Sequence, residues 1–196
     1  MAKGSGGARP GGRTRRTRDA VHDATRALIA EMDGQLPTLA QVADRSGVHL
    51  ATIYRRWRTL PALVLDVAVD DLEETSPIAV TGDLRFDLLA YARNLAEGVV
   101  APGGLGFLRS LIDSANDPDT EPERTRLLAT RRLDRFQEIL DAGHATQLTP
   151  LDLVDNLLAP IYLRALLLEP VDPHGPVPER LVANLVAIQK ARIGGA

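Results

Sequence analysis

Apolar side chains recur every three or four residues through most of the chain, the spacing that aligns them along one face of an α-helix. The first such segment covers residues 17–32, where Val21, Leu28 and Met32 share a face and Gly34 ends the pattern. No stretch shows the strict alternation of apolar and polar residues that is typical of a β-strand. The pattern predicts an all-α fold of about nine helices, with a small three-helix front and a larger helical body.

Further helices in the front of the chain are separated by residues that end helices. Thr38 is a suitable N-cap for a helix over residues 39–46, and Gly47 breaks that helix. Thr59 precedes a longer helix and Pro61 is tolerated in its first turn. We expect a second short helix over residues 49–57, and the longer helix over residues 60–74.

The body follows a linker that we expect at Ser76–Gly82. Its helices are expected over residues 83–99, 102–115, 118–142, 150–168 and 179–193. Asp117 and Pro118 are predicted as the N-cap and first residue of the third of these, and Thr149 as the N-cap of the fourth. Pro160 lies inside that fourth helix and should kink it.

Composition narrows the function classes. The chain has 196 residues, 44% of them hydrophobic and 25% charged, which is ordinary for a soluble globular protein. The absence of cysteine excludes disulfides, thiolate metal sites and cysteine nucleophiles. No apolar run is long enough to span a membrane and no secretory signal is evident, so we expect a cytoplasmic protein.

Charge is divided unevenly along the chain. Residues 1–66 carry 11 basic and 6 acidic side chains, whereas residues 67–196 carry 12 basic and 20 acidic ones. A basic front on an acidic body indicates that the front meets a polyanion. We expect three parts: a disordered basic tail over residues 1–16, a DNA-binding unit over 17–75, and an effector-binding and dimerisation unit over 76–196.

The segment from Leu39 to Trp57 fits a helix-turn-helix. Ala43 is small where a second helix must cross, and Gly47 supplies the conformational freedom of the turn. Val48 fills the corner and Ile53 anchors the second helix on its inner side. The remaining residues of the second helix form an outer face that can enter a major groove.

These residues, within the run TLAQVADRSGVHLATIYRRWRTLPALVLDVA from Thr38 to Ala68, resemble the DNA-binding domain of the TetR/AcrR family of bacterial transcriptional regulators. The resemblance implies a homodimeric, ligand-responsive regulator, most simply a repressor, on a pseudo-palindromic double-stranded operator. The DNA-contacting residues that we expect are Arg15, Arg16, Arg18, Thr38, His49, Leu50, Ala51, Thr52, Tyr54, Arg55, Arg56 and Arg58.

Two features leave an alternative open. Leu60 stands where the family usually has a polar, phosphate-contacting residue, and the second helix begins with the donor-poor residues His49, Leu50 and Ala51. A helical ligand- or protein-binding dimer that retains the fold without specific operator recognition is therefore a second hypothesis. Trp57, the single tryptophan, is predicted to be core rather than contact.

The body is expected to bind a small-molecule effector and a second copy of the chain. The candidate effector-binding residues are Tyr91, Phe107, Arg109, Phe136 and Tyr162. The candidate dimerisation residues, on the last two helices, are Leu151, Val154, Leu158, Val182, Leu185 and Val186. No pair of histidines has metal-ligand spacing, so no metal, cofactor or enzymatic activity is expected.

Overall fold

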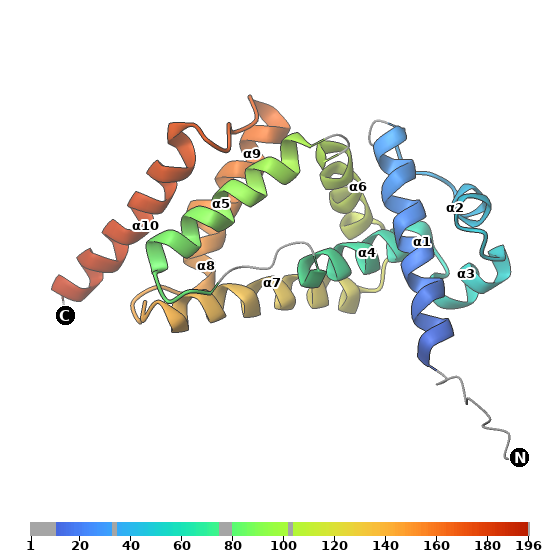
Figure 1. The fold of residues 1–196 in the computed structure, drawn as a ribbon, viewed down its shortest axis with the longest axis horizontal. Coiled ribbons are helices and arrows are strands. Elements are labelled where there is room, and N and C mark those ends of the chain that lie inside the picture. The colour runs from blue at the N-terminus through green and yellow to red at the C-terminus, as the bar shows by residue number, and fades with distance from the viewer. Residues whose placement is uncertain (1–10, 33–34, 75–79, 102–103, 196) are drawn as a thin grey trace, which may run out of the picture.

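The computed structural model describes residues 11–32, 35–74, 80–101 and 104–195, and these form an all-helical protein with no β-strand among them. Figure 1 shows a small unit of helices at the N-terminal end joined to an elongated helical body. The predicted fold class is confirmed. The first ten residues of the expected tail and most of the expected linker lie outside the described residues.

The N-terminal head consists of the first four helices. They are α1 (Gly11–Glu31), α2 (Leu39–Ser46), α3 (Leu50–Trp57) and α4 (Leu60–Glu74). The helix α1 begins six residues before the predicted start, so residues 11–16, which we expected in the disordered tail, are helical. The head core is formed by Val21, Ala24, Leu28, Leu39, Val42, Ala43, Ile53, Trp57, Leu63 and Val67.

The body contains the remaining helices. They are α5 (Leu84–Val100), α6 (Gly104–Asn116), α7 (Pro122–Ala142), α8 (Pro150–Leu153), a π-helical turn at Val154–Leu158, α9 (Ala159–Leu167) and α10 (Pro176–Gly194). Because α8, the π turn and α9 follow one another without a break, the described residues form nine continuous helical segments, as the pattern predicts.

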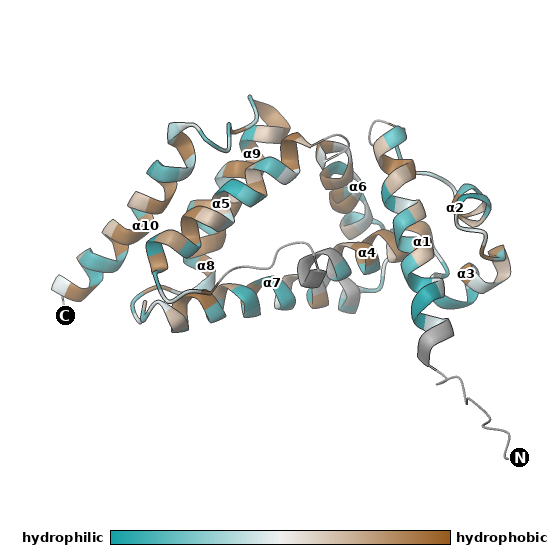
Figure 2. Cartoon of the chain, viewed as in Figure 1, coloured by the Kyte–Doolittle hydropathy of each residue, from teal (hydrophilic) through white to brown (hydrophobic). Residues whose placement is uncertain are grey.

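The helix α4 connects the two parts. It packs against α1 and α3 within the head and against α6 and α7 of the body. Its described residues are mostly hydrophobic (Figure 2), and it buries Leu63 and Val67 in the head core. Phe107 of α6 also packs against that core, so head and body share an apolar contact.

The start of α7 differs from the prediction. Asp117 and Pro118 do not begin the helix: the Asp119 N–H donates to Asp117 Oδ1 at 2.8 Å, closing a separate turn. Pro122 occupies the first turn of α7 instead. Both prolines follow an acidic residue, so the local sequence suits either start. The Thr120 hydroxyl donates to the Ser114 carbonyl at 2.8 Å and holds the chain in the turn before the helix begins.

Pro160 produces the irregularity that was expected, in the form of a π turn. Proline has no N–H to donate to the Asn156 carbonyl, and its ring collides with that carbonyl in a regular helix. The wider turn before it, in which the Ala159 N–H bonds to the Val154 carbonyl, relieves the collision. The Asn156 side chain in turn donates to the Asp152 carbonyl at 2.9 Å.

Candidate nucleic-acid interface

The junction of α2 and α3 has the geometry that a helix-turn-helix needs. The Gln41 N–H donates to Thr38 Oγ1 (3.2 Å) and the Thr38 N–H donates to Gln41 Oε1 (2.7 Å), a reciprocal cap at the start of α2. At its other end Gly47 adopts φ 68°, a left-handed angle that glycine accepts without steric cost. A Cβ on Gly47 would meet no atom within 4 Å, so the backbone angle alone explains the glycine.

The inner side of α3 is fixed in the head core. Ile53 and Trp57 are almost completely buried, as are Val42 and Ala43 of the preceding helix. The predicted inward positions are therefore confirmed, including Trp57. Leu50, an expected DNA contact, packs partly against the same core, so only part of its side chain faces outward.

The outer side of α3 presents polar and cationic groups to solvent. Tyr54 is 51% exposed, and His49, Ala51, Arg55 and Arg56 are exposed beside it. Arg15, Arg16, Thr38 and Arg58 are exposed elsewhere on the head, and Thr52 is half-buried. The Thr38 hydroxyl is occupied in the cap of α2.

A strained residue joins α3 to α4. Arg58 has φ 60° and ψ −47°, and the Thr59 N–H donates to the Trp57 carbonyl at 2.7 Å. This γ-turn is unfavourable for a residue with a side chain, and such strain concentrates at functional sites. The tight turn sets α4 directly after α3.

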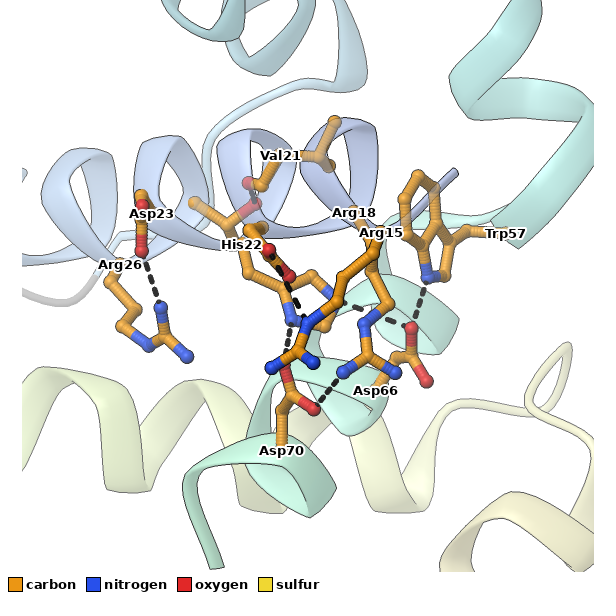
Figure 3. Close-up of polar contacts among 11 residues, drawn as sticks. Arg15, Arg18, Val21, His22, Asp23, Arg26, Trp57, Asp66 and Asp70 are labelled. Carbon is orange, nitrogen blue, oxygen red and sulfur yellow. Dashed lines mark hydrogen bonds and ion pairs between the residues drawn. The ribbon is translucent and has the colours of Figure 1, made fainter. Parts of the chain in front are cut away.

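A buried polar cluster connects three helices of the head (Figure 3). We call it the His22 cluster; its members are Arg18 and His22 of α1, Trp57 of α3, and Asp66 and Asp70 of α4. His22 lies between the two carboxylates: its Nδ1 is 2.9 Å from Asp70 Oδ2 and its Nε2 is 3.2 Å from Asp66 Oδ2. The indole N–H of Trp57 donates to Asp66 Oδ2 at 2.7 Å. Arg18 pairs with the other oxygen of Asp70.

The Asp66 carboxylate is kept ionised by these neighbours. Burial by itself would raise the pKa of Asp66, but the hydrogen bonds from His22 and Trp57, together with the charges of His22 and Arg56, lower the pKa to about 2. The Arg56 guanidinium also stacks over the Trp57 ring, 5.0 Å from its centre. Trp57 therefore links the surface of α3 to α4.

Sequence reasoning missed most of this cluster. Arg18 was expected on phosphate, but its guanidinium is committed to Asp70 in the interior. Sequence reasoning excluded metal-ligand spacing for all the histidines, His22 included, and singled out neither aspartate. The available signal was local: His22 lies on the buried side of α1, and Asp66 and Asp70 are one turn apart on α4.

The predicted effector-binding residues do not form one site. Tyr91 and Phe136 are buried and meet edge to face at 5.2 Å. The Tyr91 hydroxyl accepts a hydrogen bond from Arg132 at 2.5 Å; burial raises the pKa of Tyr91, and the nearby Tyr162 adds to that increase.

The other two candidates lie apart from this group. Phe107 packs on the head core, and Arg109 is exposed on α6. An open groove in the body lies between the end of α6 and the start of α7, lined in part by Pro118, Thr120 and Arg126, and none of the five predicted residues lines it.

The predicted dimerisation residues are placed unequally. Val182 and Leu185 point into the core of their own protomer and are fully buried, so they cannot face a second copy. Val154, Leu158 and Val186 pack partly against that core. Leu151 is exposed, and the exposed side of α8–α9 continues from it at intervals of four residues through Asp155, Ala159, Leu163 and Leu167.

The structure was also compared with what a metal site and a membrane span require. Among the described residues, no group of three or more His, Asp or Glu side chains is placed to hold a metal ion. No single helix in the described ranges is long and apolar enough to cross a membrane, although α5 and α6, bent by 93° at their junction, meet the length and composition criteria as a pair.

Comparison with known proteins agrees with the helix-turn-helix geometry. The tetracyclin repressor-like C-terminal domain model matches residues 78–187, more than half of the chain. The HTH-type transcriptional regulator AqdR of Rhodococcus erythropolis is 34% identical over 128 residues, covering 65% of this chain and 61% of AqdR. The HTH-type transcriptional regulator YdeS of Bacillus subtilis strain 168 is 26% identical over 157 residues, covering 77% of this chain and 79% of YdeS.

The aligned segment thus spans less than two thirds of AqdR but most of YdeS. The family model covers the body, and the helix-turn-helix occupies the head. From the match over the body and the regulators it resembles, the chain belongs to the TetR family.

Proposed function

We propose that this protein is a ligand-responsive transcriptional repressor that binds a pseudo-palindromic operator as a homodimer. The observation that carries the proposal is the outer side of α3, where Tyr54, Arg55 and Arg56 are exposed while Ile53 and Trp57 fix the helix from within. Arginine and tyrosine side chains on a rigid helix are suited to phosphate and base edges in a major groove.

Affinity is expected to come mainly from phosphate contacts. The exposed cations Arg15, Arg16, Arg55, Arg56 and Arg58 all belong to the head. Base recognition rests on His49, Thr52 and apolar contact from Ala51, because α3 begins with few hydrogen-bond donors.

The homodimer places two such heads on successive major grooves. We assign its interface to the exposed side of α8–α9, with Leu163 (55% exposed) and Leu167 (72% exposed) as the main apolar residues. One exposed side of α10 carries the small residues Ala183, Ala187 and Ala191, which permit close approach of helices.

We place the effector in the body, between α5, α7 and α9. Arg132 and Tyr162 are the partly exposed side chains next to the buried Tyr91 there. An effector that lowers operator affinity must itself bind more weakly, by the same factor, to the operator-bound protein.

The test is a selection from randomised duplex DNA, repeated at two salt concentrations. Recovery of a palindrome whose affinity falls steeply with salt supports the operator proposal. The double variant Tyr54→Ala/Arg55→Ala should lose sequence-specific binding while it remains a dimer, and Arg85→Ala, which removes an exposed arginine of the body, should bind as the wild type does. Recovery of no motif would leave the second hypothesis, a dimer without operator recognition.

A further inference from the structure

Both ring nitrogens of His22 face carboxylate oxygens. Nδ1 is 2.9 Å from Asp70 and Nε2 is 3.2 Å from Asp66. A neutral imidazole has one N–H and one lone pair, so one of these contacts would set a lone pair against an anionic oxygen. An imidazolium donates a hydrogen bond from each nitrogen and satisfies both contacts.

The charges around His22 also favour the protonated ring. His22 is 1% exposed and Asp70 is almost as fully buried, so solvent does not screen them. The cluster holds two carboxylates and one arginine, Arg18, whose guanidinium contacts Asp70. A protonated His22 places a cation between the buried Asp70 and the partly exposed Asp66, beside Arg18 and the Arg56 charge that also acts on Asp66.

We propose that His22 is a buried imidazolium that positions the recognition helix, and that operator binding weakens when His22 loses its proton. The connection runs through Asp66, which accepts from His22 and from the Trp57 indole, and Trp57 is the last residue of α3. His22 therefore acts on DNA contacts made by its neighbours and makes none itself. This inference rests on the proposed operator binding.

The charged groups around His22 come from three helices of the head. Arg18 on α1 and Arg56 on α3 are permanent cations, and Asp66 and Asp70 are the carboxylates that face the ring from α4. The helices α2 and α6 also pack against α1. Their charged residues are all exposed: Asp44, Arg45, Arg109 and Asp113.

The first measurement uses Trp57 as a reporter, because it is the only tryptophan of the chain and its ring centre is 5.9 Å from that of His22. Tryptophan emission of the full-length protein without DNA is recorded from about pH 5.5 to about pH 9, where histidine is the side chain expected to titrate. We expect a single transition in the wild type and none in His22→Gln. Nitrogen NMR of the wild-type ring, which does not depend on a variant that folds, should show both ring nitrogens protonated below the transition.

The second measurement is operator affinity over the same pH range. The wild-type affinity should fall by about tenfold across the transition seen in the fluorescence, the order expected for loss of one charged hydrogen bond. His22→Gln should bind weakly throughout and show no step at that pH. His174→Gln, which alters an exposed histidine of the body, should retain the step.

Each outcome decides between the two proposals. A ring that NMR shows to be neutral at the pH where operator is bound overturns the inference, as does a fluorescence transition without a matching change in affinity. An affinity step that persists in folded His22→Gln assigns the pH dependence to another group and also overturns it. If the wild type binds no duplex at any pH, the proposed function fails, and the fluorescence and NMR results still report separately on the protonation of His22.

Discussion

Gly47 is the residue at which the turn of the head depends most directly on one backbone angle. Its φ of 68° costs a residue with a Cβ about 1–2 kcal/mol, and no atom within 4 Å would add a steric clash. We therefore expect Gly47→Ala to lower the free energy of unfolding by about 1–2 kcal/mol. Gly47→Asn should lower it less, because asparagine tolerates the left-handed region. Urea denaturation of the three proteins measures the difference.

A matched glycine in the body provides the control. Gly98 lies inside α5, and a Cβ there would also meet no atom within 4 Å. Gly98→Ala should raise the free energy of unfolding by about 0.5–1 kcal/mol, because glycine disfavours a helix interior. Equal effects of the two alanine substitutions would show that the angle at Gly47 is not what the turn requires.

Asp66 gives the head a defined acid sensitivity. Its pKa is lowered from 3.8 to about 2 in the folded state, so its ionised form stabilises the fold above the unfolded-state pKa. That contribution is lost as the pH falls from about 4 through about 2. At neutral pH, Asp66→Asn should be less stable by about 1–2 kcal/mol, allowing for solvent screening of a partly exposed carboxylate, and the gap to wild type should close near pH 2.

Urea denaturation at a series of pH values checks this prediction. Asp23→Asn is the control, because Asp23 lies on α1 but its side chain is 77% exposed and pairs with Arg26 one turn away. A gap between wild type and Asp66→Asn that does not change between neutral and acid pH would mean that the carboxylate charge is not what Asp66 contributes.

Among the elements, α3 has the most direct consequence for function. Arg55 lies on its exposed side, and each phosphate that a cation neutralises contributes about −0.9 to the slope of log affinity against log salt. A dimer loses two such contacts in Arg55→Ala, so the slope should become shallower by about 2. Fluorescence anisotropy of a labelled operator at several salt concentrations measures it, and Arg85→Ala should leave the slope unchanged.

The elements themselves were largely predictable because their signals are local. Thr38, Gly47 and Thr149 each act within a few residues of their own position, and the structure places all three as predicted. The start of α7 was not predictable in this way, because Pro118 and Pro122 both suit a first helical turn. Only the contact of Thr120 with Ser114 decides between them. The strain at Arg58 has no sequence signal.

The candidate sites were less predictable, because they depend on which helices meet. The spacing of Val182 and Leu185 correctly indicated an apolar side of α10 but not that α5 and the π turn of the same protomer cover it. The His22 cluster joins residues that are 44 and 48 positions apart, and no periodicity within either helix encodes that pairing. A helical pattern shows which side of a helix is apolar, but only the tertiary structure shows which other helix covers that side.

For the molecule as a whole, the proposed homodimer depends on the exposed leucines of α9. Leu163→Glu/Leu167→Glu places charge on the proposed interface and should convert the dimer to a monomer at micromolar concentration, since buried unpaired charge opposes association. Light scattering coupled to size exclusion measures the mass. Leu127→Glu, at an exposed leucine of α7, should remain dimeric. A dimer that survives the double substitution would place the interface elsewhere.

The π turn at Val154–Leu158 also constrains how this chain can vary in length. Leu153, Leu157, Ile161 and Ala165 are all buried at strict intervals of four, although a regular α-helix rotates about 40° with each such step. The wider turn takes up part of that rotation and keeps both the buried and the exposed rows aligned past Pro160. Deleting one residue here would remove the π turn and restore a regular helix, with Ile161 and Ala165 still facing the core, because the wider turn is what accommodates the additional residue. A chain one residue shorter at this place can therefore keep the same apolar pattern in the helix that follows.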